Sequence, residues 1–457
     1  MKKVILFGAG KYYQKYKHYI EDEIVAICDN AKEKKGKRID GHLVISPDEI
    51  MHYNPDEIII LSIYINEIRE QLCKLGIDSS IIKAFYEIKY EKEINEIVYN
   101  NTTIERSKER ILVVSHDLST TGAPIALLEA VNQLRNLGYF VTVASPDDGD
   151  MREAFLSNCD QLVIDEKLRF SKLSEIEWTG TYSLVFINTV HLFYLLRDLK
   201  PTQRVLWWLH EPECFYSSVD SKCIAAFDFM RISVFAVSEI AREAFVKICN
   251  VVDCRILPLC IKDCPRETSA NYEELNCILI GEISKLKGQA FVVEAIRRIT
   301  RYTDRKVKVL FIGGDDSALA GELKATVERE KLPIYFWGKV SNYETLGYIE
   351  KCNLLICASE VETLSVSVLE GMMKKVACLV TDSSGIHTYI SNFSDGIVFH
   401  ACDVDDIFNK LLWCMDNLHD LEKIGNRGRK IYEKYFSVEK FQEAIYEVIN
   451  SLTISYL

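Results

Sequence analysis

Short apolar runs alternate with helix-patterned segments along most of this chain, and the alternation begins three times. The first series opens with VILFGAG from Val4, the second with ILVVSHD from Ile111, and the third with CILIGEISKLKG from Cys277. Strands that alternate with helices build parallel sheets covered by helices. A length of 457 residues also suggests about three domains. The sequence therefore predicts an α/β protein with three such domains in tandem.

A polar stretch from Asn100 to Arg110 separates the first series from the second. We therefore expect an accessory domain over residues 1–105, followed by a pair of similar α/β domains over residues 106–270 and 271–436. A helix predicted over residues 437–457 ends the chain and would cross back to the first domain of the pair. Two such domains present loops at their strand ends, which is the usual place for ligands in folds of this kind.

Composition limits the classes of partner. The formal net charge of −12 argues against a nucleic acid, because binding to nucleic acid rewards clustered Lys and Arg. The 15 cysteines are scattered and form no C-x-x-C pair, which predicts reduced thiols and no metal site. No apolar run reaches the length of a transmembrane helix. We expect a cytoplasmic protein, with local basic surface as a candidate for peripheral contact with anionic lipid head groups.

The first domain carries part of a dinucleotide-binding fingerprint. Gly8 and Gly10 follow the first strand, and Asp29 ends the second strand 21 positions after Gly8. Tyr13 occupies the position of the third glycine, which weakens the match. Gly8, Gly10 and Asp29 are therefore candidates for an accessory nucleotide site, and a purely structural sheet is the alternative. The segment GHLVISPDEI from Gly41 is similar to a small Rossmann-like domain found ahead of sugar-modifying enzymes.

Two glutamates in the third domain, Glu362 and Glu370, have seven residues between them. The apolar residues Asn353–Cys357 before them predict a buried strand, and Ser365–Met373 has the apolar spacing of a helix. Glu362 then lies in the loop and Glu370 two turns along the helix. Two carboxylates at this spacing suit hydroxyl groups on two parts of one extended ligand, with a phosphate at the amides that open the helix.

This segment resembles the E-x7-E motif of glycosyltransferase family 4, whose members have the GT-B fold and retain the configuration of the transferred sugar. The resemblance implies that Glu362 contacts the sugar and that Glu370 holds the ribose of the nucleotide. Thr363 and Ser365 stand where the family commonly has glycine. Both are small, so the loop of Thr363, Leu364 and Ser365 is predicted to bind the donor.

Further motifs extend the resemblance from about Ile111 to Phe436. Lys287 matches the lysine of G-R-L-x-x-x-K-G and would pair with the diphosphate, where negative charge grows as the sugar leaves. Glu282 stands where that motif has arginine. His210 resembles the His of a His-Glu-Pro element near the sugar and its phosphate, and an imidazole can donate a hydrogen bond there.

Two glycines complete the predicted site. Gly122, in SHDLSTTGAP, lies in a segment similar to the first loop of the family, especially of a branch acting in capsule and surface-polysaccharide assembly. Gly338 follows IYFW, where the nucleobase usually rests. Thr388 stands where the family commonly has glutamate.

The resemblance implies a retaining, metal-independent hexosyltransferase. It would move a sugar from a nucleotide-sugar to a saccharide or lipid-linked acceptor, in surface polysaccharide or glycan biosynthesis, without a cofactor. Glu282 and Thr388 motivate an alternative, a non-catalytic nucleotide-sugar-binding or regulatory partner of a glycosyltransferase. An NAD-linked oxidoreductase and a nucleotide-sugar epimerase are further alternatives. The sugar, the nucleotide, the acceptor and the oligomeric state are not predicted.

Overall fold

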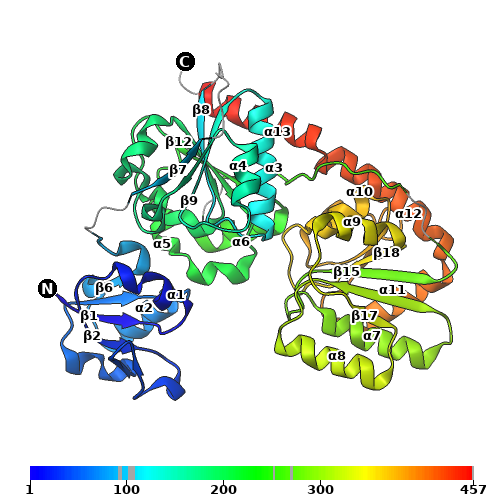
Figure 1. Ribbon diagram of the computed structural model, residues 1–457, viewed down its shortest axis with the longest axis horizontal. Coiled ribbons are helices and arrows are strands. Elements are labelled where there is room, and N and C mark those ends of the chain that lie inside the picture. The colour runs from blue at the N-terminus through cyan, green and yellow to red at the C-terminus, as the bar shows by residue number, and fades with distance from the viewer. Residues whose placement is uncertain (91–94, 101–108, 251–252, 268–270, 455–457) are drawn as a thin grey trace. The chain divides into compact units, whose positions relative to one another are not determined.

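The computed structural model describes residues 1–90, 95–100, 109–250, 253–267 and 271–454. The chain divides into two compact units. The first comprises Met1–Val234 and Phe245–Cys254, and the second comprises Phe235–Ala244 and Arg255–Leu457. Three sheets carry the fold, and each has helices packed against it (Figure 1). The predicted α/β class is confirmed.

The first sheet has six strands in the order β3-β4-β2-β1-β5-β6, and all its pairs are parallel except β3 with β4. Their bounds are β1 (Lys3–Phe7), β2 (Glu23–Cys28), β3 (Arg38–Ile39), β4 (His42–Ile45), β5 (Glu57–Ile60) and β6 (Ile82–Ala84). Helices α1 (Lys11–Tyr16) and α2 (Ile65–Lys74) follow β1 and β5. Val4 to Phe7 are buried, as a central parallel strand requires.

The second sheet has eight strands in the order β14-β13-β12-β11-β8-β9-β10-β7. Their bounds are β7 (Ile97–Asn100), β8 (Arg110–Val114), β9 (Phe140–Ser145), β10 (Gln161–Ile164), β11 (Leu184–Asn188), β12 (Arg204–Leu209), β13 (Ile232–Ala236) and β14 (Cys254–Ile256). β7 pairs antiparallel with β10, so this sheet begins ahead of the predicted boundary at residue 105. That boundary itself lies outside the described residues.

Aromatic side chains join the first two sheets within the first unit. The rings of Tyr86 and Tyr194 stack with an interplanar angle of 2° and centroids 5.8 Å apart. Phe85 meets Tyr194 edge to face at 6.0 Å. The hydroxyl of Tyr86 donates to Asp220 at 3.0 Å, and Arg69 forms an ion pair with the same carboxylate. Residues before β7 therefore pack against the second sheet through a buried aromatic cluster with a charged pair beside it.

The third sheet, in the second unit, has six parallel strands in the order β17-β16-β15-β18-β19-β20. Their bounds are β15 (Leu275–Ile280), β16 (Val307–Ile312), β17 (Ile334–Phe336), β18 (Leu354–Cys357), β19 (Ala377–Thr381) and β20 (Ile397–Phe399). Because helices cover both faces, the strands β18 and β19 are buried at every position rather than at alternate ones.

The helices of the second unit form two layers (Figure 1). One face of the sheet is covered by α7 (Gln289–Tyr302), α8 (Ala318–Glu330) and α11 (Val404–Asp416). The other face is covered by α9 (Asn342–Lys351), α10 (Val366–Met373) and α12 (Leu418–Ile431). The last helix is α13 (Val438–Ile454), which confirms a helix from about Ser437. Among the described residues, the helices are either too short or too polar to span a bilayer.

Candidate donor-binding site

The predicted strand–loop–helix unit around the two glutamates is confirmed. All of β18 is buried, and α10 begins at Val366 with Ser365 as its N-cap residue. Glu362 is tied to the loop after β19, because its amide donates to the Ser383 carbonyl at 3.1 Å and its carbonyl accepts from the Gly385 amide at 2.8 Å. The backbone of Glu362 is therefore fixed on both sides at the carboxyl edge of the sheet.

Gly385 permits this approach of the two loops. A Cβ at Gly385 would lie 1.9 Å from the carbonyl oxygen of Thr363, which no side chain tolerates. Thr363, Leu364 and Ser365 are nearly buried. The loop after β19 thus holds the predicted donor-binding loop by direct backbone contact.

Lys287 forms an ion pair with Glu362. Burial lowers the pKa of Lys287, but the charge and hydrogen bond of Glu362 outweigh burial and raise it above its usual value. The lysine therefore stays charged at neutral pH. Gly288 brings the two segments together, since it has a φ of +69° and a Cβ there would lie 1.9 Å from the Ala358 carbonyl oxygen.

Gln289 was missed by the sequence reasoning, although it directly follows the Lys287-Gly288 pair. Its buried side chain donates to the carbonyl oxygen of Glu282 at 3.1 Å and accepts from the amide of Ser284 at 3.3 Å. It therefore fixes the turn that carries Lys287. The side chain of Glu282, at the family's arginine position, is exposed.

Glu370 lies on α10 with only 7% of its surface exposed. Asn342 donates a hydrogen bond to its carboxylate at 2.7 Å. Burial raises the pKa of Glu370 to about 7, and the hydrogen bond from Asn342 opposes that shift. This carboxyl group therefore exchanges its proton near neutral pH. Asn342, the first residue of α9, is a second polar group that the sequence did not indicate.

Gly338 follows β17 with a φ of +73°. Its carbonyl accepts from the amide of Gly313 at 3.0 Å, which joins the turns after β17 and β16. Gly338 thus lies at the same carboxyl edge of the sheet as the loops of Lys287 and Glu362. Of the predicted site residues, Lys287, Glu362–Ser365, Glu370 and Gly338 belong to the second unit.

His210 and Gly122 belong to the first unit. His210 follows β12, and its ring meets Trp208 edge to face with centroids 4.5 Å apart. Burial, with a smaller effect of His116, lowers the pKa of His210 to about 3, so the imidazole is neutral at pH 7. Trp207 and Trp208 are fully buried and belong to the core.

The turn after His210 is held by a buried carboxylate. Glu211 accepts from the amides of His210 at 2.9 Å and Val190 at 3.1 Å, while burial raises its own pKa. Gly122 opens α3 (Gly122–Asn136), is exposed, and a Cβ there would meet nothing within 4 Å. Asn188 at the end of β11 donates to the neighbouring Ala123 carbonyl at 3.1 Å.

No group of three or more His, Cys, Asp or Glu side chains is arranged for a metal ion in the part of the chain that the structure describes. All 15 cysteines are free thiols, and most are buried.

Three family models match successive parts of the chain. Residues 1–83 match the C2185-like N-terminal domain, residues 106–255 match glycosyl-transferase family 4, and residues 263–431 match glycosyl transferases group 1. Two α/β domains, each built on a largely parallel sheet and each matched by a glycosyltransferase model, have the GT-B fold. Both α/β domains therefore match glycosyltransferase models, and the chain fits a GT-B glycosyltransferase with an additional N-terminal domain.

Solved structures agree with this fold. HepE of Anabaena, crystallised with UDP and glucose, is 13% identical with a TM-score of 0.63, covering 75% of this chain and 99% of HepE. Sucrose-phosphate synthase of Thermosynechococcus elongatus is 15% identical with a TM-score of 0.59, and the match covers 76% of this chain and 100% of the synthase. The lipopolysaccharide outer core galactosyltransferase WaaB is 13% identical with a TM-score of 0.57, and the match covers 77% of this chain and 100% of WaaB. No curated protein sequence matches the chain.

Proposed function

We propose that this protein transfers a hexose from a nucleotide-sugar to a saccharide or lipid-linked acceptor, with retention of configuration and without a metal ion. The observation that carries the proposal is the convergence of Lys287, Glu362 and the start of α10 at one edge of the third sheet. HepE, which shares the fold, is solved with UDP-glucose. A donor of this class fits a site that offers one cation, one loop carboxylate and one helix carboxylate.

The charges of the site match the charges of the reaction. The bond between the anomeric carbon and the diphosphate oxygen breaks, and its electron pair leaves with the diphosphate. The acceptor hydroxyl oxygen forms the new bond to the same face of that carbon, and its proton goes to the leaving phosphate oxygen. Lys287 and the amides that open α10 then stabilise the growing negative charge. No protein base or nucleophile is required by this route.

In this proposal each glutamate has a different task. Glu362 accepts a hydrogen bond from a hydroxyl group of the sugar, while Lys287 exchanges part of its contact with Glu362 for the diphosphate. Glu370 accepts hydrogen bonds from the ribose hydroxyls in its ionised form, and its pKa is raised to about 7. The imidazole of His210, which belongs to the first unit, is neutral and able to donate a hydrogen bond to a sugar hydroxyl or a phosphate oxygen. Synthesis of a surface polysaccharide or another glycan is the process that such a transfer serves.

A screen of UDP-, GDP- and TDP-sugars by thermal unfolding tests donor binding. A ligand present at a hundred times its dissociation constant stabilises the folded state by about 2.7 kcal/mol. The Glu370→Ala variant should lose about 1.5–3 kcal/mol of binding free energy for the donor, because the ribose hydroxyls lose a charged acceptor. Unchanged affinity of that variant, measured by calorimetry, would contradict the assignment of Glu370.

A non-catalytic, nucleotide-sugar-binding partner of a glycosyltransferase is the second candidate. The observation that favours it is the exposed Glu282 at the position where the family has arginine. Thr388, where glutamate is common, donates its hydroxyl to the Gly385 carbonyl at 2.9 Å and so serves the loop itself. Donor binding without turnover, over a panel of saccharide and lipid-linked acceptors, would favour this second function.

A further inference from the structure

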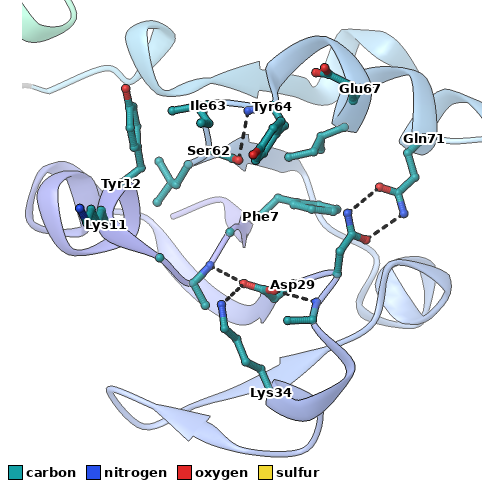
Figure 2. Close-up of a pocket in the computed structure, with 17 residues that line it drawn as sticks. Phe7, Lys11, Tyr12, Asp29, Lys34, Ser62, Ile63, Tyr64, Glu67 and Gln71 are labelled. Carbon is teal, nitrogen blue, oxygen red and sulfur yellow. Dashed lines mark hydrogen bonds and ion pairs between the residues drawn. The ribbon is translucent and has the colours of Figure 1, made fainter. Parts of the chain in front are cut away.

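A pocket of about 590 Å³ lies at the carboxyl edge of the first sheet, far along the chain from the transferase motifs. Its walls are the segments that follow β1, β2 and β5 (Figure 2). β2 pairs with one side of β1 and β5 with the other, so the connections diverge at β1. Open α/β sheets bind ligands at such a point, and the volume lies in the range of small-molecule sites.

The two glycines of the fingerprint have different reasons to be glycine. Gly8 has a φ of +110°, and a Cβ there would lie 2.5 Å from the Leu61 carbonyl oxygen, so the turn itself requires it. Gly10 is exposed with a φ of −112°, and a Cβ there would meet nothing within 4 Å. The backbone does not require glycine at position 10. Gly10 lines the pocket, and open space lies where its side chain would be.

Asp29 lines the pocket, but its carboxylate already serves the protein. It accepts from the amides of Ala9 and Ala31, each at 2.8 Å, and from Lys34 Nζ at 2.9 Å. These hydrogen bonds and the charge of Lys34 outweigh burial and keep the pKa of Asp29 below its usual value. Asp29 is therefore a positioning residue that joins the turn after β1 to the segment after β2.

The remaining wall combines apolar surface with two exposed charged side chains, Lys11 and Glu67. Ile63 and Tyr64 are 37% and 54% exposed, which is unusual for residues of this size, and Tyr12 is half-buried (Figure 2). The polar side chains of Asn30 and Gln71 hydrogen-bond to each other at 3.1 and 2.9 Å. Lys11 is exposed and has no ion pair within the described parts of the chain. Lys34, in contrast, is neutralised by Asp29.

We propose that this pocket binds a nucleotide, with its base against Ile63 and Tyr64 and its phosphate at Lys11. A flat ring covers the exposed apolar wall, since aromatic side chains such as Tyr64 stack on nucleobases. The phosphate group of the same ligand forms an ion pair with the ammonium group of Lys11 at the edge of the pocket. This site is separate from the donor site of the third sheet and does not rest on the proposed transfer activity.

Calorimetric titration of the full chain with AMP, UMP and GMP tests the proposal. The Gly10→Leu variant places a side chain in the pocket without backbone strain, and should weaken nucleotide binding at least tenfold. Gly321→Leu is the matched control, because Gly321 on α8 is also exposed with nothing within 4 Å of its Cβ position. Circular dichroism of both variants shows whether each remains folded. Binding by Gly10→Leu equal to that of the wild type, or no binding of the three nucleotides to any form, overturns the proposal.

Two further measurements locate the parts of the ligand. Lys11→Ala should weaken binding of the nucleotide that binds best and leave the corresponding nucleoside unaffected. Ribose 5-phosphate, which lacks the base, should bind at least tenfold more weakly than that nucleotide. Equal losses for nucleotide and nucleoside would contradict the phosphate position at Lys11. Equal affinity for ribose 5-phosphate would show that Ile63 and Tyr64 do not hold a base.

Discussion

Lys287 and Glu362 form an ion pair although 75 positions separate them in the chain. The sequence resemblance assigned them to different parts of a donor, the diphosphate and the sugar. Their contact means that each residue fixes the other before a ligand arrives. A diphosphate that binds Lys287 therefore competes with a carboxylate at the same amine, and this competition sets the charge balance of the site.

Replacement of Lys287 by alanine should lower the rate of transfer at least tenfold, or about 1.4 kcal/mol, because the leaving diphosphate loses its cation. Steady-state kinetics with a saturating donor measures this loss. Lys285→Ala is the matched control, since Lys285 is an exposed lysine of the same turn and should retain the wild-type rate. Equal rates for both variants would show that the diphosphate does not bind at this turn.

Replacement of Glu282 by arginine should raise donor affinity, because it restores the positive charge that the family has at this position. The gain should be larger at low salt than at high salt, because position 282 is exposed and salt screens an exposed charge. Calorimetry at two salt concentrations gives the comparison. A loss of affinity would instead indicate that Glu282 has a task of its own in holding the donor.

Replacement of Glu370 by glutamine should change the pH dependence of stability. Burial raises the pKa of the Glu370 carboxyl group in the folded state from 4.5 to about 7. The contribution of this group to the free energy of unfolding is therefore fully present below pH 4.5 and is lost as the pH rises through 7. The glutamine variant cannot ionise, so its Tm relative to the wild type should be higher at pH 8.5 than at pH 5. Glu328→Gln, on the exposed face of α8, should show no such difference between the two pH values.

Replacement of Glu350 by alanine should destabilise the second unit by about 3–5 kcal/mol, because it removes the carboxylate of a buried ion pair. Lys374 is 2% exposed, and its Nζ lies 2.5 Å from Glu350 and 3.2 Å from the Pro265 carbonyl oxygen. Denaturant unfolding measures the change. The double variant Glu350→Leu with Lys374→Met should recover much of the lost stability, and failure to recover it would show that packing, not charge burial, causes the loss.

Replacement of Asp220 by alanine should cost about 1.5–3 kcal/mol, since Arg69 and Tyr86 lose a shared charged acceptor between the first two sheets. Asp228→Ala is the control, because its ion pair with Arg231 is exposed and such pairs contribute about 0–1 kcal/mol. Unfolding free energies of the two variants should differ accordingly. Similar values would mean that the aromatic stack of Tyr86 on Tyr194 alone holds this contact.

The strands and helices were largely predictable because their signal is local. β18 begins one residue after the predicted Asn353 and ends at the predicted Cys357, and α10 begins one residue after the predicted Ser365. Burial of a parallel strand on both faces demands consecutive apolar residues, which a single sequence displays. The place of β7 was not visible, because its antiparallel pairing with β10 depends on residues more than 60 positions away.

The sequence by itself determined the fold class, the family motifs and the position of Glu362 and Glu370 on their loop and helix. The tertiary structure alone decided what these groups contact and how they are charged. The pKa of Glu370 is raised by burial, and Lys287 meets Glu362 only when the chain folds. Asp29 supports its turn through three hydrogen bonds that form in the folded chain. Spacing along a chain encodes local geometry, whereas desolvation and ion pairing depend on neighbours that arrive from distant segments.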